Sequence, residues 1–135
     1  HNNLNGIIPS SFWKLPHLHQ VTLRNNLITS LSLQGLLTTD PTKDPRSPLE
    51  NLIVSDNHVT TLNGIGNAAT TLKLINVNKN QIDRTLLDEL CFCVNLEILY
   101  LAFNRIPGTI PTCIGKLTKL TEFYGFDNRF SGTLP

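Results

Sequence analysis

The sequence carries little charge, and its positive and negative charges nearly cancel. Charged residues make up 16% of the 135 residues, and 11 Lys and Arg stand against 10 Asp and Glu, which gives a net charge of +1. Nucleic acids and anionic membrane surfaces attract proteins with a strong positive excess, so neither is expected as a partner. The apolar fraction of 40% is too high for a disordered chain.

Methionine is absent, and the chain begins at His1. We therefore expect a fragment of a longer protein. No apolar run approaches the roughly 18 residues that are needed to span a bilayer, so we expect no membrane insertion of this segment. No secretory leader is recognisable.

A spaced pattern of aliphatic residues and asparagine recurs along the chain. The pattern is L-x-x-L-x-L-x-x-N-x-L, and it starts at residues 18, 49, 72, 96 and 120, in steps of 31, 23, 24 and 24. A fixed period of roughly 20 to 50 residues is typical of solenoids, in which each repeat buries its apolar face against the next. We predict one solenoid domain over residues 1–135, with repeats at 18–48, 49–71, 72–95 and 96–119 and partial repeats at 1–17 and 120–135.

This pattern resembles that of leucine-rich repeat proteins. The outer segments also read N-x-L-x-G-x-I-P or nearly so, at residues 2–9, 104–111 and 128–135. That variant is similar to the plant-type subclass, which is found in plant receptor ectodomains and polygalacturonase-inhibitor-like proteins. The segments after Asn26, Asn57 and Asn80 lack the Gly-x-Ile-Pro element.

The resemblance implies a curved, right-handed α/β solenoid with a parallel β-sheet on the concave face and short helical, 3-10 or irregular segments on the convex face. It also implies polar caps at both ends, which we expect to be missing from this chain. Residues 85–91 predict one short convex helix with Thr85 as its N-cap. The long step contains an insertion of about seven residues at 38–48, and its three prolines predict an exposed loop that is either a plain connection or part of a binding surface.

Asparagine is frequent although it is a poor former of helices and strands. Within each repeat one asparagine follows the strand, where its amide can pair with backbone groups that the turn leaves unpaired. We predict a structural ladder with one rung per repeat, formed by Asn26, Asn57, Asn80, Asn104 and Asn128.

The three cysteines do not have the spacing of a zinc site. Cys93 takes a position that leucine usually fills, so we favour a buried free thiol there. Cys91 and Cys113 lie in adjacent repeats, and a disulfide between them is an alternative to free thiols.

Catalytic patterns are also missing. There is no glycine-flanked nucleophile and no phosphate-binding loop, and Gly64-Ile-Gly66 is too short for a dinucleotide fingerprint. His17, His19 and His58 fall at different phases of the repeat and do not converge. We expect no enzyme activity, no cofactor and no metal site.

Function in a solenoid usually lies in the side chains that the repeat leaves free on the sheet. The N-terminal half of this face is polar, whereas the C-terminal half gathers apolar and aromatic residues. An exposed apolar patch with a polar rim indicates an interaction site, and Tyr and Phe are favoured anchors. Cross-strand packing alone is the competing explanation. The predicted partner-binding residues on the concave face are Leu74, Ile98, Tyr100, Phe103, Tyr124 and Phe126.

We therefore expect a non-catalytic module that recognises a protein or peptide, within a larger receptor-like or secreted protein. One alternative is a spacer or assembly segment that packs against neighbouring repeats or caps of a longer solenoid. Another is glycan binding or binding of the kind seen in inhibitors of cell-wall enzymes. The family resemblance implies the cell surface or secretion, but Asn-x-Ser/Thr glycosylation sites are absent, so an intracellular setting stays open.

Overall fold

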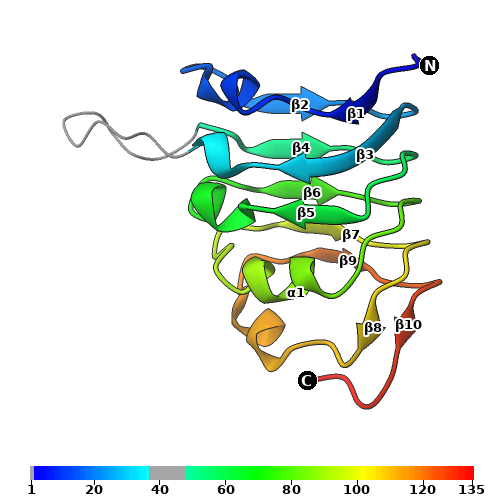
Figure 1. Cartoon of the computed structure of the whole chain (residues 1–135). Helices are drawn as coiled ribbons and strands as arrows, with labels where there is room; N and C mark the ends of the chain where they lie inside the picture. Colours follow the sequence, from blue (N-terminus) through cyan, green and yellow to red (C-terminus); the bar gives the residue numbers. More distant parts are fainter. Residues whose placement is uncertain (1, 37–47) are drawn as a thin grey trace.

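A computed structural model describes residues 2–36 and 48–135, so most of the predicted 38–48 loop lies outside the described residues. The repeats stack in one direction, and the two ends of the chain lie at opposite ends of the stack (Figure 1). The predicted α/β solenoid is confirmed by this stack. Its largest sheet is parallel and has five strands in the order β2-β4-β6-β7-β9. These strands are Gln20–Thr22, Asn51–Ile53, Leu74–Asn76, Ile98–Tyr100 and Glu122–Tyr124.

The register of this sheet aligns equivalent positions of successive repeats. Leu52 pairs with Ile75, and Ile75 pairs with Leu99, so the central residues of the strands form one inward column. All three side chains are fully buried. Each buried Leu or Ile contributes roughly 1.5–3 kcal/mol relative to an exposed one. The central residues of the strands, which the 24-residue period predicts to align, therefore form the centre of the hydrophobic core.

Two smaller parallel sheets were not expected from the sequence. One has the order β1-β3-β5, formed by Asn5–Ile7, Leu27–Ser32 and Thr61–Asn63, and the other pairs β8 (Pro107–Gly108) with β10 (Arg129–Phe130). β3 and β5 form without the Gly-x-Ile-Pro element, because the backbone after each asparagine can pair with the repeat before it, as when Thr60 N–H donates to the Thr29 carbonyl. Where the element is present, Gly108 has a φ of 82°, a conformation that glycine adopts at little cost.

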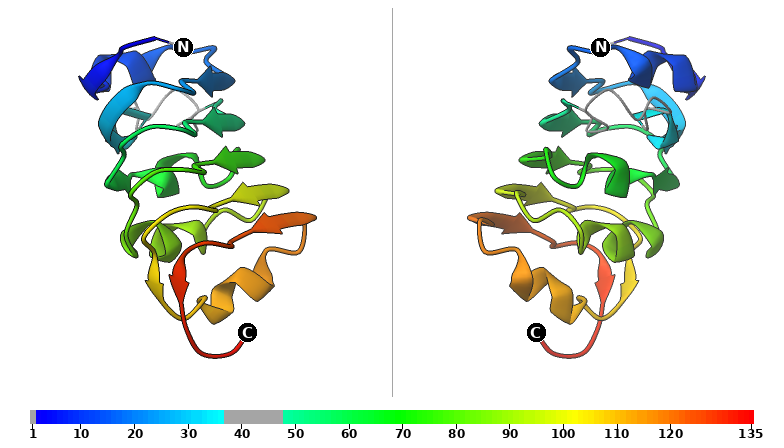
Figure 2. Two further views of the ribbon diagram at one scale, coloured as in Figure 1. Left: turned by 90° about the vertical axis from the view of Figure 1, so that its right-hand side faces the viewer. Right: turned by 90° about the vertical axis from the view of Figure 1, so that its left-hand side faces the viewer.

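Short helical segments line the side opposite the five-stranded sheet (Figure 2). Four are 3-10 turns: η1 (Ser10–Lys14), η2 (Gln34–Leu36), η3 (Ile65–Ala68) and η4 (Thr112–Lys116). The α-helix α1 spans Thr85–Leu90, close to the predicted range. The prediction that Thr85 caps it is wrong: Thr85 is the first helical residue, and its N–H and hydroxyl donate to Asp83 Oδ1 at 3.0 and 2.8 Å. Arg84 holds the N-cap position and its side chain makes no capping hydrogen bond, so the Asp83 carboxylate accepts from the free N–H of Thr85 instead.

The asparagine side chains form hydrogen bonds between successive repeats. Asn80 is an example: its Nδ2 donates to the carbonyls of Val54 and Val77 at 3.0 and 3.1 Å, and its Oδ1 accepts from Val59 N–H at 2.9 Å. Equivalent bonds to the preceding repeat are made by Asn57, Asn104 and Asn128. Asn26 accepts from Leu4 N–H. Each rung thus supplies partners for backbone groups that would otherwise be buried and unpaired.

Trp13, the single tryptophan, packs at the N-terminal end of the core. Its side chain is buried and meets Phe12 edge-on, with ring centroids 5.2 Å apart. Its Nε1 has no hydrogen-bond partner among the described residues.

Candidate functional site

The predicted binding residues lie on or directly after the last three strands of the five-stranded sheet. Leu74 is on β6, Ile98 and Tyr100 are on β7, and Tyr124 is on β9. Tyr100 pairs in register with Tyr124, which brings their rings to the same face. Phe103 and Phe126 follow β7 and β9 by two or three residues, in the turns that leave the sheet.

Four aromatic rings are in contact with one another on this face. The rings of Tyr100 and Tyr124 are stacked, with centroids 4.5 Å apart and planes inclined by 16°. The Phe126 centroid lies 6.4 Å from that of Tyr124 and 5.1 Å from that of Phe103, which it meets edge-on. We call these four residues the concave aromatic cluster. Rings at such distances attract one another beyond their buried area.

The backbone conformation at the end of β7 directs Phe103 outward. Phe103 has a φ of 56°, and the equivalent positions Asn25, Asp56, Lys79 and Asp127 have φ between 52° and 56°. Its N–H donates to the Phe126 carbonyl at 3.1 Å, which fixes the two turns against each other. An aromatic residue is unusual in this left-handed conformation, which favours Gly, Asn and Asp. The fold therefore holds Phe103 at a strained position where its ring stays exposed.

Glu122 on β9 holds the Tyr100 ring in place. The Tyr100 hydroxyl donates a hydrogen bond to Glu122 Oε2. This hydrogen bond is the main reason why the pKa of Tyr100 is raised to about 12, and desolvation and the negative charge of Glu122 act in the same direction. The phenol therefore stays protonated and paired throughout the physiological range.

Leu74 and Ile98 lie beside the cluster and are less accessible. They pair in register on adjacent strands and both are half-buried. Ile98 precedes Tyr100 by two residues, so both side chains face the same side of the sheet. The two aliphatic residues extend the apolar surface toward the start of the strands.

Charged residues border the cluster on the side of the earlier repeats. Lys79 Nζ lies 5.9 Å from the centroid of the Phe103 ring, a cation–π distance. Lys79 Nζ is also 3.6 Å from Asp56 Oδ1, and Asp56 Oδ2 accepts from Arg24 Nε at 3.3 Å. The aromatic surface therefore has a polar rim.

Glu122 and Lys79 were missed as members of this site by the sequence analysis. Both occupy columns of the repeat that the 24-residue period already defines. A search along those columns for charged neighbours of the aromatic residues would have found them.

The cysteines divide into a bonded pair and a buried thiol. Cys91 and Cys113 form a disulfide that links the C-terminal end of α1 to η4. Cys93 is free and completely buried. Burial, with a smaller contribution from the charge of Glu89, raises the pKa of its thiol to about 12, so it stays protonated.

The histidines do not gather at this site. His17, His19 and His58 are exposed and belong to different parts of the repeat. Within residues 2–36 and 48–135, no three His, Cys, Asp or Glu side chains are grouped so that they could hold a metal ion. In the same ranges, no helix is long and apolar enough to cross a membrane.

Residues 95–117 match a family model described as Leucine Rich Repeat. A curated relative from Arabidopsis thaliana, named Protein phosphatase 1 regulatory inhibitor subunit PPP1R7 homolog, is 29% identical over 150 residues. That match covers 95% of this chain and 43% of the relative, so the chain spans less than half of the relative's length.

Several solved structures are similar along nearly the whole chain. A TDR receptor has a TM-score of 0.78 and 28% identity, over 99% of this chain and 22% of the receptor. An internalin from Listeria monocytogenes has a TM-score of 0.73 and 26% identity, over 93% of this chain and 34% of its own. The Arabidopsis receptor kinase HAESA, solved with the peptide hormone IDA and the co-receptor SERK1, has a TM-score of 0.64 and 27% identity, over 100% and 26% of the two chains.

Proposed function

Because this chain is a leucine-rich repeat protein, we propose that it is a non-catalytic module that binds a protein or peptide through its concave aromatic cluster. The observation that carries this proposal is the exposure of three large rings side by side. Phe103, Tyr124 and Phe126 are 45%, 47% and 56% exposed. Aromatic side chains bury a large area with few rotatable bonds, which makes them frequent anchors of interfaces.

The polar rim supports a partner that is an extended peptide or a protein loop. Lys79, Asp56 and Arg24 form a linked set of charges beside the rings. Such rim groups orient a partner and reject wrong ones more than they add affinity. The peptide-bound state of HAESA, a structure of the same fold, is in keeping with this kind of partner.

Cross-strand packing explains the position of Tyr100 in the cluster, but it does not explain why the outer rings stay exposed. Tyr100 is half-buried between Tyr124 and Glu122 and fits a packing role. Phe126 reaches beyond the strands and remains more than half exposed. We assign the packing role to Tyr100, and contact with the partner to Tyr124, Phe126 and Phe103.

We further propose a receptor-like or secreted protein as the setting of this module. The disulfide between Cys91 and Cys113 supports an oxidising environment such as the cell surface. We propose the single solenoid over residues 1–135, with its four full and two partial repeats, as the binding unit.

The test is selection of peptides from a displayed random library on the unmodified chain, followed by titration of variants. Tyr124→Ala combined with Phe126→Ala should lower the affinity of the selected peptides at least about thirtyfold, since the loss of one aromatic anchor alone costs about 2 kcal/mol. Phe92→Ala removes an equally exposed ring outside the cluster, since Phe92 is 65% exposed, and should leave the affinity unchanged. Equal binding to the cluster variant and the unmodified chain would contradict the proposal.

A further inference from the structure

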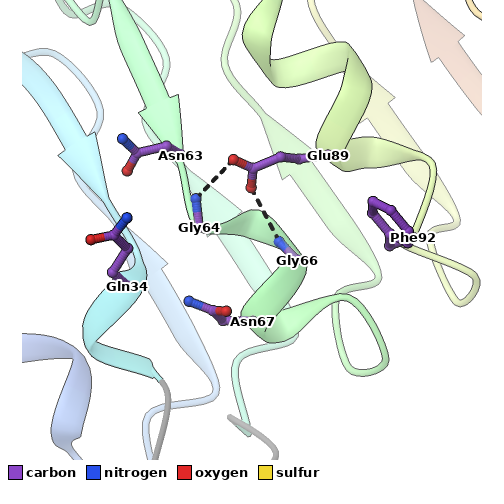
Figure 3. Close-up of a pocket in the computed structure, with 7 residues that line it drawn as sticks. All are labelled: Gln34, Asn63, Gly64, Gly66, Asn67, Glu89 and Phe92. Atoms are coloured by element: carbon purple, nitrogen blue, oxygen red, sulfur yellow. Dashed lines mark hydrogen bonds between the residues drawn. The ribbon is translucent and has the colours of Figure 1, made fainter.

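A hollow lies among the helical segments on the convex side, opposite the five-stranded sheet (Figure 2), and Figure 3 shows the residues that line it. Its walls come from three successive repeats: Gln34 from η2, Asn63 and Asn67 from β5 and η3, and Glu89 and Phe92 from the region of α1. Its volume is about 590 Å³, within the range of roughly 300–1,000 Å³ that is usual for small-molecule sites.

Two glycines keep the floor of the hollow open. Gly64 has a φ of 76°, and a Cβ there would lie 2.7 Å from the backbone nitrogen of Gln34, so the turn requires glycine. At Gly66 a Cβ would meet nothing within 4 Å. The space above Gly66 is therefore free, and the backbone lies at the surface of the hollow.

The Glu89 carboxylate is fixed at the centre of the site. Its Oε1 accepts from Gly64 N–H at 3.1 Å, and its Oε2 accepts from Gly66 N–H at 3.2 Å. Figure 3 shows it between the amide side chains on one side and Phe92 on the other. Each carboxylate oxygen can accept more than one hydrogen bond, so Glu89 keeps acceptor capacity for a ligand.

Amide side chains provide the other polar groups. Within the described residues, the side chains of Gln34 and Asn63 make no hydrogen bond, and both residues are exposed. Asn67 Nδ2 donates to the Leu33 carbonyl at 3.3 Å, which holds the side chain while its Oδ1 has no partner in the same part of the chain. Amides both donate and accept, which matches the properties of hydroxyl groups.

Phe92 adds an apolar surface at the edge of the hollow. Its ring is 65% exposed and, unlike the four rings of the concave aromatic cluster, it contacts no other aromatic ring in the described parts of the chain. An exposed ring next to hydrogen-bonding groups suits a ligand that has one apolar face and several hydroxyls.

We propose that this convex hollow binds a neutral oligosaccharide. Hydroxyl groups would pair with the amides and with Glu89, and the C–H face of a sugar ring would lie against Phe92. The lining contains no Lys or Arg, so a phosphate or uronate would meet Glu89 without a compensating cation. A purely apolar ligand would leave the amides unpaired. This places glycan binding on the convex side rather than on the concave sheet.

The experiment is a titration, followed by NMR, with a panel of neutral pentasaccharides: cellopentaose, xylopentaose, mannopentaose and chitopentaose. At least one should shift the backbone N–H signals of Gly64 and Gly66, with a Kd on the order of 1 mM. Pentagalacturonate, which carries negative charge, should bind at least about tenfold more weakly. Absence of a shift with all four neutral sugars, or equal binding of the uronate, would overturn the proposal.

Two variants with matched controls locate the binding. Gly66→Leu fills the open space, whereas Gly115→Leu adds the same side chain to η4, where a Cβ also meets nothing within 4 Å. Gly66→Leu should weaken binding at least about tenfold, and Gly115→Leu should leave it unchanged. Phe92→Ala should also weaken binding, with Phe126→Ala as its control, and this pair decides the question if Gly66→Leu does not fold. Unchanged affinity in Phe92→Ala and in a folded Gly66→Leu would show that the sugar binds elsewhere and would overturn the proposal.

Discussion

Asn80 shows how a single side chain connects two repeats. Its amide satisfies two buried backbone carbonyls of different repeats and one backbone N–H. This role follows from the sequence, because the asparagine recurs at a fixed distance after each strand and a turn there leaves backbone groups unpaired. The hydrogen bonds were therefore predictable from chemistry and periodicity.

Replacing Asn80 tests the contribution of one rung. Asn80→Ala should lower the free energy of unfolding by about 1–3 kcal/mol, since it leaves buried groups without partners. Asn128→Ala should cost less, because the Asn128 side chain is only half-buried and water can reach the groups it leaves. Urea denaturation measures both values. An equal loss at the two positions would argue against burial as the cause.

Some residue roles could not be predicted from one sequence. Glu89 caps the turn of a neighbouring repeat across 25 and 23 residues, and this depends on how α1 sits against η3. The position of α1 depends on side-chain packing between repeats, and the repeat pattern of the sequence does not specify that packing. The ring geometry of the concave aromatic cluster has the same origin: the columns were predictable, whereas the stacking and the Glu122 hydrogen bond were not.

At the scale of elements, strands β7 and β9 are joined by both backbone and side chains. Tyr100 and Tyr124 stack across the two strands, and the Tyr100 hydroxyl donates to Glu122 on the neighbouring strand. The pairing of these strands followed from the 24-residue step. The small sheets β1-β3-β5 and β8-β10 did not, because the recurring pattern predicts a strand only before each asparagine and not in the segment that follows it.

The pairing of Tyr100 with Glu122 makes the stability of this part of the sheet depend on pH. Folding raises the Tyr100 pKa from 10.0 to about 12, so the contribution is complete below pH 10 and is lost as the pH rises toward 12. In Tyr124→Phe, Tyr100 is the single tyrosine, and its absorbance titration should give a pKa well above 10. Adding Glu122→Ala removes the acceptor and should return that pKa toward 10. An equal Tyr100 pKa with and without the Glu122→Ala substitution would refute this explanation.

At the scale of the molecule, stability accumulates by stacking of neighbouring repeats. The strands β4, β6 and β7 are paired on both sides, whereas β2 and β9 are paired on one side in the described chain. The core follows the same order: Leu52, Ile75 and Leu99 are completely buried, and Phe123 on β9 is half-buried. In a solenoid each repeat is stabilised only by its immediate neighbours.

Hydrogen exchange should reflect this arrangement. We expect backbone amides of β4, β6 and β7 to exchange at least about tenfold more slowly than those of β2 and β9, because opening the interior breaks contacts on two sides. Mass spectrometry of deuterated fragments measures the difference. Uniform protection along the sheet would instead indicate that the solenoid opens only as a whole.

The position of Trp13 gives the molecule separate optical signals at its two ends. Trp13 is buried in the first turns of the solenoid, and both tyrosines lie on its last strands. Tryptophan fluorescence therefore monitors one end and tyrosine absorbance the other, without any added label. If the two unfolding curves coincide, the repeats melt together, and if they separate, one end opens first.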